Sequence, residues 1–443
     1  MHQTAGEIDF QELAEAWWLL DTPERIAGFR LLEPADAEEF FFDLPTPDQA
    51  DLVLSLTVPE RRIWLRLLPP DDAADLIQET AEEGRTALLG LLDDATRREV
   101  TALLAYEEDE AGGLMSSRYT RVRPDMTVDE AISYLRKQAQ GRVDVETIYY
   151  VYVLDSAQRL LGVLSFRELF AAPGNRTVRE VMHSEDLVVV PEEMDQEAVA
   201  RLFAEYDVLA LPVVDGEGRM KGIVTVDDIV DVVEEEATED IQKYGAMEAL
   251  EEPYLRIGFG TLVRKRAPWL CILFFGGMLT ATAVARFEGV ITTIVGLAAF
   301  MPLVIASGGN SGSQASTLVI RAMTVGEVRL RDWWRVARRE IAVGIVLGLI
   351  LAALGFGRVW LAGLIGFPDN AETILFGVTI GASLVAVVLF GTLVGSMLPL
   401  LLERAGFDPA SASAPLVSTL VDVSGLLIYF TFATWLLQAQ IGP

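Results

Sequence analysis

The sequence predicts a multidomain membrane protein. A cytosolic α-superhelical N domain, a tandem pair of α+β domains and a linking helix precede an all-α membrane domain of five helices. Three observations predict this class. Acidic residues gather in the first part of the chain, while the remainder is apolar and nearly neutral. Five apolar stretches are long enough to cross a bilayer. Ahead of them, a helical repeat is followed by two copies of a strand–helix–strand–strand–helix pattern.

The charge distribution limits what the first part can bind. The chain has a formal net charge of −30, and all of this excess lies before residue 261. Such a surface repels nucleic acid and anionic lipid, and it attracts cations. The histidines, His2 and His183, and the cysteine, Cys271, have no metal-ligand spacing, which argues against a zinc or copper site. The acidic N-terminus lacks an apolar h-region, so we expect no secretory signal.

Residues 1–112 are predicted to form an acidic α-superhelical N domain. Leu44-Pro45, Leu68-Pro69 and Leu92-Asp93 recur at intervals of 24 residues, each before a short helical pattern, with weaker half-steps between them. Such short helices cannot bury their apolar faces alone, so they must stack. The expected outer face carries Asp48, Asp51, Asp71, Asp72, Asp75, Asp93 and Asp94. This face is either simply solvated or a cation-binding surface.

Residues 113–176 and 177–236 each contain the strand–helix–strand–strand–helix pattern. The second copy includes VVDGEGRMKGIVTVDDI, with a hairpin turn and a G-I-V-T-x-x-D run. These units resemble CBS domains, which pair as a module. In many CBS domains the final aspartate, here Asp228, holds a ribose, and Glu168 stands at the equivalent place in the first copy. The resemblance therefore implies ATP as a candidate ligand, and the alternative is a purely structural pair.

Residues 237–264 are predicted to be a linking helix that acts as a plug. Glu234, Glu235, Glu236, Glu239 and Asp240 crowd two helical turns at its start. Like charges at i, i+4 repel by a few tenths of a kcal/mol. The simple interpretation is a solvated face. Because a transport domain follows, the alternative interpretation is an ion-gated segment, whose position depends on cations bound by these acids.

Residues 265–443 are predicted to be the membrane domain. The apolar stretches span residues 267–285, 290–320, 341–366, 374–402 and 410–437, and the second and fourth are long enough to be tilted or broken. Basic residues cluster before the first stretch and between the second and third, so the positive-inside rule places both clusters in the cytoplasm. We therefore expect a cytoplasmic N-terminus and an external C-terminus in a bacterial inner membrane.

Asp422 is the candidate pore acid. It is the ionisable residue within the run 410–437. A carboxylate at bilayer depth costs about 2.5–3.5 kcal/mol on insertion scales, so it is expected to face a wet cavity, an ion or a partner. The polar run ASGGNSGSQAST at 306–317 is either a small-residue helix contact or a cavity lining. The candidate lining residues are Gly308, Gly309, Asn310, Gln314 and Ser418. The alternative for Asp422 is a buried structural acid.

Taken together, the superhelix, the CBS-like pair, the linking helix and the motifs GGNSGSQASTLVIRAM and PLVSTLVDVSGLLIY resemble the MgtE family of bacterial magnesium channels over the whole chain. The resemblance implies a Mg²⁺-selective channel for magnesium uptake, built as a homodimer in the lipid bilayer. Cytosolic Mg²⁺ between the soluble domains and the plug helix would hold the pore shut. Asp422 matches the pore acid, whereas Ala414 departs from an asparagine found in some members.

The same resemblance implies further metal ligands. Asp408 corresponds to a ligand near the cytoplasmic pore mouth. The residues that correspond to regulatory ligands are Asp207, Asp228, Asp231, Glu236, Glu239 and Asp240. A largely hydrated ion held by one or two carboxylates suits Mg²⁺, and other small divalent cations could use the same oxygens.

Two other function classes fit the sequence less well. A secondary transporter would favour inverted repeats and further intramembrane charges, and neither is found in the sequence. A membrane enzyme would need a nucleophile–base pair, a metal triad or a phosphate loop, and none appears. We therefore expect a channel and no enzymatic activity, with unitary currents as the feature that separates a channel from a carrier.

Overall fold

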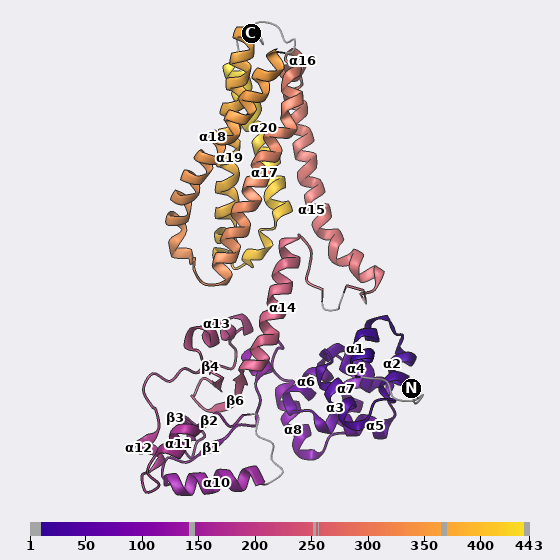
Figure 1. The fold of residues 1–443 in the computed structure, drawn as a ribbon, viewed down its shortest axis with the longest axis vertical. Helices are drawn as coiled ribbons and strands as arrows, with labels where there is room; N and C mark the ends of the chain where they lie inside the picture. The colour runs from indigo at the N-terminus through magenta and orange to yellow at the C-terminus, as the bar shows by residue number, and fades with distance from the viewer. Residues whose placement is uncertain (1–9, 141–146, 251–253, 256, 365–369, 438–443) are drawn as a thin grey trace, which may run out of the picture. The chain divides into compact units, whose positions relative to one another are not determined.

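The computed structural model describes residues 10–140, 147–250, 254–255, 257–364 and 370–437. The chain divides into two compact units, Met1–Glu235 and Glu236–Pro443. The first unit contains the superhelix and the α+β pair (Figure 1). The second contains the membrane helices and the linking helix, which is the end of α14 (Val226–Tyr244) and stops at Tyr244.

The N domain is a stack of short helices. Its elements are α1 (Phe10–Ala16), η1 (Trp17–Leu19), α2 (Thr22–Phe29), α3 (Pro34–Asp43), α4 (Thr46–Ser55), α5 (Val58–Leu67), α6 (Pro70–Gln78), α7 (Glu82–Leu89) and α8 (Asp94–Leu103). From α3 to α8, successive helices begin 12 residues apart. The predicted 24-residue repeat and its half-steps are therefore real helix pairs. Proline at the first turn begins several of these helices, where its missing N–H costs no hydrogen bond.

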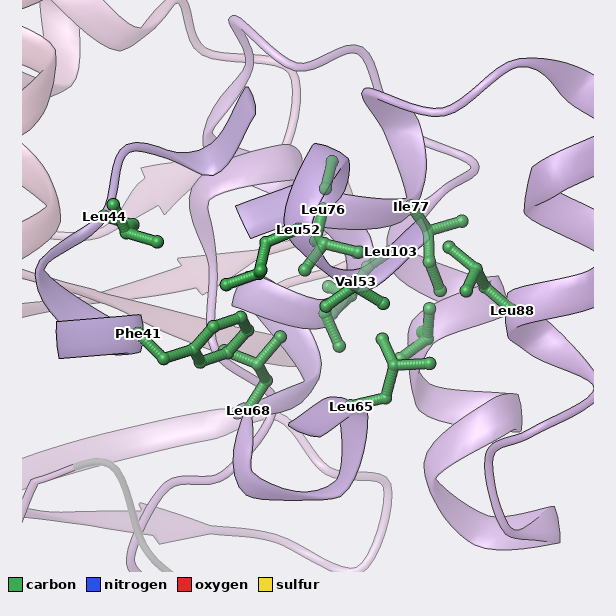
Figure 2. Packing of buried hydrophobic residues seen from close by; sticks show 14 of the residues in the cluster. Phe41, Leu44, Leu52, Val53, Leu65, Leu68, Leu76, Ile77, Leu88 and Leu103 are labelled. Carbon is green, nitrogen blue, oxygen red and sulfur yellow. The ribbon is translucent and has the colours of Figure 1, made fainter. Parts of the chain in front are cut away.

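The stacked helices bury a continuous apolar core. Figure 2 shows Phe41, Leu65, Leu76 and Leu88 within it, and each is fully buried. Burying a side chain of this size stabilises the fold by about 1.5–3 kcal/mol. Because each short helix contributes only a few such residues, neighbouring repeats are needed to complete the core.

The outer-face prediction is wrong for two of the acids. Asp48 is 1% exposed and Asp71 is 7% exposed. Asp48 is drawn inward by Arg25, whose Nη1 lies 3.4 Å from its Oδ1. Arg25 itself lies over the indole ring of Trp17, 5.1 Å from the ring centre. Asp51, Asp93 and Asp94 of the predicted face are exposed, and Asp94 forms a surface ion pair with Arg97.

The two α+β copies have the predicted element order. The first contains β1 (Arg121–Val122), α10 (Val128–Gln140), β2 (Tyr150–Leu154), β3 (Leu160–Ser165) and α11 (Phe166–Ala171), with α12 (Val178–Val181) after it. The second contains β4 (Val190–Pro191), α13 (Gln196–Tyr206), β5 (Ala210–Val214), β6 (Met220–Thr225) and α14 (Val226–Tyr244). In each sheet a parallel strand pair adjoins an antiparallel hairpin, in the orders β1-β2-β3 and β4-β5-β6.

The superhelix packs against the second copy within the first unit. Its core is continuous with Val190, Val213 and Ile229. The short helix α9 (Ala111–Leu114) joins the two parts, and the N–H of Ala111 donates to the carbonyl of Met194 at 2.7 Å. This docking places N-domain acids beside the start of α14.

Among its described residues, the second unit contains five helices long and apolar enough to span a membrane, which agrees with the predicted number. They are α15 (Phe259–Arg286), α17 (Val295–Thr324), α18 (Trp333–Leu364), α19 (Asn370–Arg404) and α20 (Ala414–Leu436), with α16 (Glu288–Thr293), η2 (Leu330–Asp332) and η3 (Pro409–Ser411) between them. The second predicted stretch is interrupted at Ile294, between α16 and α17, whereas the fourth is continuous. Helix α19 packs against α17, α18 and α20.

Candidate ion-binding sites

Glycines of α17 allow neighbouring helices to approach closely. A Cβ atom added to Gly312 would lie 2.9 Å from the carbonyl oxygen of Gly391 and 2.9 Å from Cγ1 of Val417. Gly308 is similarly covered by Val387. Small residues at such contacts are typical of packed membrane helices. Part of the 306–317 run therefore serves helix packing.

Asp422 lies on α20, beside a different strip of α17. A Cβ atom on Gly309 would lie 3.8 Å from Oδ1 of Asp422 and 3.4 Å from Oγ of Ser418. The hydroxyls of Ser418 and Ser313 are 3.2 Å apart, and that of Ser313 donates to the carbonyl of Ala414 at 3.3 Å. Asp422 is partly buried, and no ion pair to it is found in the described part of the chain. Asp422, Ser418 and Ala414 follow one another at intervals of one helical turn along α20, so these oxygens form a polar strip rather than a single ligand set.

The structure brings only part of the predicted lining to Asp422. Gly309 and Ser418 lie beside it, whereas Gly308 faces Val387. Asn310 is exposed on α17. Gln314 lines a separate cavity of about 380 Å³ between α17, α18 and α19. Ser313 was not among the predicted lining residues, although its i+4 spacing from Gly309 places it on the same helix face.

A second group of acids surrounds Lys243 at the end of α14. We call it the Lys243 cluster: Glu239, Asp240, Lys243 and Asp408. Nζ of Lys243 lies 2.7 Å from Oδ2 of Asp408, and it also forms an ion pair with Glu239. Burial lowers the pKa of Lys243, but the two carboxylates outweigh this effect and hold the pKa above its usual value. Burial and the nearby Asp408 raise the pKa of Asp240. Asp408, the predicted pore-mouth ligand, therefore lies close to Glu239 and Asp240, which were predicted as regulatory ligands.

The neighbouring Tyr244 contacts α17 directly. Its hydroxyl donates to the carbonyl of Ser313 at 3.0 Å and also bonds the hydroxyl of Thr317. Its ring packs with the buried group Ile320, Ala410 and Ala412. Oγ1 of Thr324 is 3.3 Å from Oδ2 of Asp240. The end of the linking helix thus lies against the same face of α17 that carries Ser313. Neither Tyr244 nor Lys243 was singled out from the sequence.

A third group of acids lies in the first unit. We call it the Asp228 cluster: Asp71, Asp72, Asp75, Glu108 and Asp228. Burial raises the pKa of Asp75 strongly, with added repulsion from the other four acids. Burial also raises the pKa of Asp228 to about 7, with a further contribution from Asp71. The sequence predicted Asp228 as a regulatory ligand, but it did not indicate which N-domain acids lie near it. A carboxylate pushed toward protonation is expected to gain from a bound cation.

The other predicted regulatory ligands are scattered. Asp207 ends α13 in a left-handed conformation with φ 50° and is exposed. Burial raises the pKa of Asp231, with repulsion from Glu234. Glu236 is partly buried on α14. Within the described residues, no group of three or more His, Cys, Asp or Glu side chains has the spacing to hold a metal ion.

The two predicted ribose contacts have a local structural role. Oδ2 of Asp228 accepts hydrogen bonds from the N–H and hydroxyl of Thr225, at 3.2 and 2.7 Å. Oε2 of Glu168 accepts the same pair from Ser165, at 2.8 and 2.7 Å. Glu168 therefore belongs to a capping box at the start of α11, and Asp228 accepts the equivalent hydrogen bonds at the start of α14. Nucleotide contact by either residue stays a prediction.

Comparisons with known proteins agree with this architecture. Residues 301–432 match the family model MgtE, described as a divalent cation transporter. Residues 8–109 match the MgtE intracellular N domain, and residues 111–175 and 178–235 match the CBS domain.

Individual relatives match over most of the chain. The magnesium transporter MgtE of Thermus thermophilus is 45% identical over 99% of this chain and 95% of its own length. That of Bacillus subtilis is 35% identical over 82% of this chain and 77% of its length. A solved structure of the cytosolic domain of the Mg²⁺ channel MgtE in complex with ATP is 46% identical, covers 51% of this chain and 91% of that chain, and has a TM-score of 0.46.

Proposed function

Because the chain belongs to the MgtE family of divalent cation transporters, we propose that it is a Mg²⁺-selective channel for magnesium uptake that cytosolic Mg²⁺ closes. The family assignment makes it a membrane transport protein with a cytosolic N domain rather than an enzyme. Selection of Mg²⁺, conduction through a pore and closure by the ion are the proposed steps.

The observation that carries the proposal is Asp422. Its carboxylate lies in a membrane helix beside Gly309, and the hydroxyls of Ser418 and Ser313 continue the same polar strip. Mg²⁺ gives up its water reluctantly and usually keeps several waters while it contacts one or two carboxylates. A single acid with neutral oxygens around it suits such a hydrated ion.

We propose that the pore forms between two copies of the chain in a homodimer. The strip on α17 and α20 supplies one carboxylate per copy. Two facing copies of Asp422 would give the divalent ion two negative charges while leaving room for its water. With five spans and a cytosolic N domain, the C-terminus would lie outside the cell.

We propose that the Asp228 cluster is the site at which cytosolic Mg²⁺ controls closure, and that Glu239, Asp240 and Asp408 of the Lys243 cluster are further Mg²⁺ ligands. Both clusters offer carboxylate oxygens, which Mg²⁺ prefers. In the Asp228 cluster, burial and mutual repulsion disfavour the charged form of Asp75 and Asp228, so a cation that neutralises them stabilises the docked arrangement. An ion that binds one state better shifts the population toward that state. Asp207, Asp231 and Glu236 are kept as further candidate ligands.

Asp422→Asn tests the proposal because it preserves volume and removes the charge. We expect Mg²⁺ uptake into proteoliposomes to fall at least about tenfold, since the ion loses a charged ligand at bilayer depth. Glu288→Gln, which changes an exposed acid at the start of α16, serves as the matched control. Uptake by Asp422→Asn at the parent rate, with both proteins folded and inserted, would make Asp422 a structural acid.

A further inference from the structure

Lys243 supplies a positive charge inside the acidic group that joins the linking helix to the loop before α20. Its Nζ lies 2.7 Å from Oδ2 of Asp408 and also pairs with Glu239. Asp408 follows α19, so this ion pair joins residues 165 positions apart in the sequence. The Lys243 side chain is 28% exposed and that of Asp408 35%, so the pair is only partly screened by water.

The ammonium uses an oxygen that a metal ion would also need. Oδ1 of Asp408 accepts the N–H of Ala410 at 2.8 Å, and Oδ2 accepts Lys243. A divalent cation that bridges Asp408 and Glu239 would therefore compete with the ammonium for Oδ2. The helix end is held against Asp408 by a charge that belongs to the chain itself.

Tyr244 provides a neutral contact next to this charged one. Its hydroxyl donates to the carbonyl of Ser313, and its ring packs with Ile320, Ala410 and Ala412. These contacts do not depend on charge. They fix where the helix end lies on α17, whereas Lys243 offsets the repulsion between the acids that approach there.

We propose that Lys243 is a positioning residue that docks the end of the linking helix on Asp408 without a metal ion. The role of this docking in closing the pore rests on the function proposed above. Without the ammonium, Glu239, Asp240 and Asp408 would face one another as three carboxylates. Docking would then require an added divalent cation to offset their repulsion.

The experiment uses the full-length protein in nanodiscs, with Ala412→Cys in a Cys271→Ser background. Ala412 is fully buried and lies in the group against which Tyr244 packs, so the introduced thiol should react with a maleimide when the helix end undocks. Rates are measured in EDTA and in millimolar Mg²⁺. In EDTA we expect Lys243→Gln to raise the rate about fivefold, as loss of a partly buried ion pair implies, and Lys243→Arg to stay within about twofold of the parent.

Two controls separate charge from packing. Lys137→Gln removes a positive charge from α10 in the first unit and should leave the rate unchanged. Tyr244→Phe removes the hydroxyl contacts and should raise the rate equally with and without Mg²⁺, because an ion cannot replace them. Mg²⁺ should return Lys243→Gln, but not Tyr244→Phe, to the parent rate.

Two results would overturn the proposal: reaction of Lys243→Gln at the parent rate in EDTA, or equal loosening by Lys243→Arg and Lys243→Gln. The second would make side-chain packing, not charge, the cause. These results are distinct from failure of the proposed channel, which Asp422→Asn tests by uptake. The docking role of Lys243 is tested by the maleimide reaction rate in EDTA. That rate does not depend on whether the protein transports Mg²⁺.

Discussion

The two CBS copies each place an acid at the same local position, but the pKa of the acid is raised in one copy and lowered in the other. Glu168 closes a capping box at the start of α11, and Asp228 accepts the equivalent hydrogen bonds from Thr225 at the start of α14. Asp228 is pushed to a pKa of about 7 by burial, with Asp71 of the N domain adding to the effect. For Glu168, burial raises the pKa, but His183 at 2.9 Å and the Ser165 hydrogen bonds outweigh it and lower the pKa to about 2. The depth of burial and the neighbouring groups, not the motif, decide which acid is suited to a regulatory cation.

The comparison predicts that neutralising Asp228 stabilises the first unit. In a fragment of residues 1–235 without Mg²⁺, we expect Asp228→Asn to raise the free energy of unfolding by about 2 kcal/mol, because a carboxylate with a raised pKa is costly when charged. The melting temperature measured by circular dichroism should rise by about 4–8 °C. Asp51→Asn, at an exposed site on the superhelix, should change it by less than about 1 °C. A lower melting temperature for Asp228→Asn would contradict the comparison.

The same acid predicts a pH dependence. The folded pKa of Asp228 is about 7, above its ordinary value of 3.8, so the folded state binds the proton more tightly. Its contribution to stability is full below about pH 4 and is lost as the pH rises to about 7. In EDTA we expect the parent fragment to lose stability as the pH rises through this window. The loss should be smaller when Mg²⁺ is present, and smaller in the Asp228→Asn variant. An identical slope in the parent and the variant would assign the effect to other groups.

The Lys243 cluster should respond to neutralisation in the opposite direction. Asp408→Asn removes a partner of Lys243, so we expect it to weaken docking of the helix end by about 1 kcal/mol. The thiol introduced by Ala412→Cys should then react about fivefold faster in EDTA. Glu403→Gln, at the end of α19, is the matched control. Slower reaction in Asp408→Asn would mean that repulsion dominates the Lys243 cluster, as it does the Asp228 cluster.

The smallest expected effect is at Glu168. Its lowered pKa means that its contribution to stability is present above about pH 4.5 and is lost as the pH falls toward 2. Because the side chains of His183 and Glu168 are 66% and 42% exposed, solvent reduces the gain to below about 1 kcal/mol. Glu168→Gln should lower the melting temperature of the fragment by about 1–2 °C at neutral pH. A rise as large as that of Asp228→Asn would remove the distinction between the two copies.

Patterns that are local in the sequence predicted the fold well. The 12-residue helix spacing, the duplicated strand order and the five spans each depend on residues close in the chain. The small-residue run was harder, because glycines used for packing and glycines beside Asp422 look alike until neighbouring helices are in place. Gly308 and Gly309 adjoin in sequence, yet Gly308 packs against Val387 and Val421 whereas Gly309 lies beside Ser418 and Asp422.

The acid clusters depend on contacts that no local pattern contains. Asp71 and Asp228 come close because the superhelix docks on the second CBS domain. Lys243 pairs with Asp408 although four membrane helices separate the two residues in the sequence. Asp48 was expected at the surface, but Arg25 holds it inside. Single-residue charge and hydropathy could not distinguish these acids from solvated ones.

Single-channel recording from the full-length protein tests the central claim most directly. With Mg²⁺ as the charge carrier, we predict unitary current steps whose open probability falls as cytosolic Mg²⁺ rises into the millimolar range. Asp422→Asn should abolish the steps, and substitution of the Asp228 cluster should weaken the dependence on cytosolic Mg²⁺. Slow Mg²⁺ transport without unitary steps, or an open probability that ignores cytosolic Mg²⁺, would contradict a Mg²⁺-gated channel.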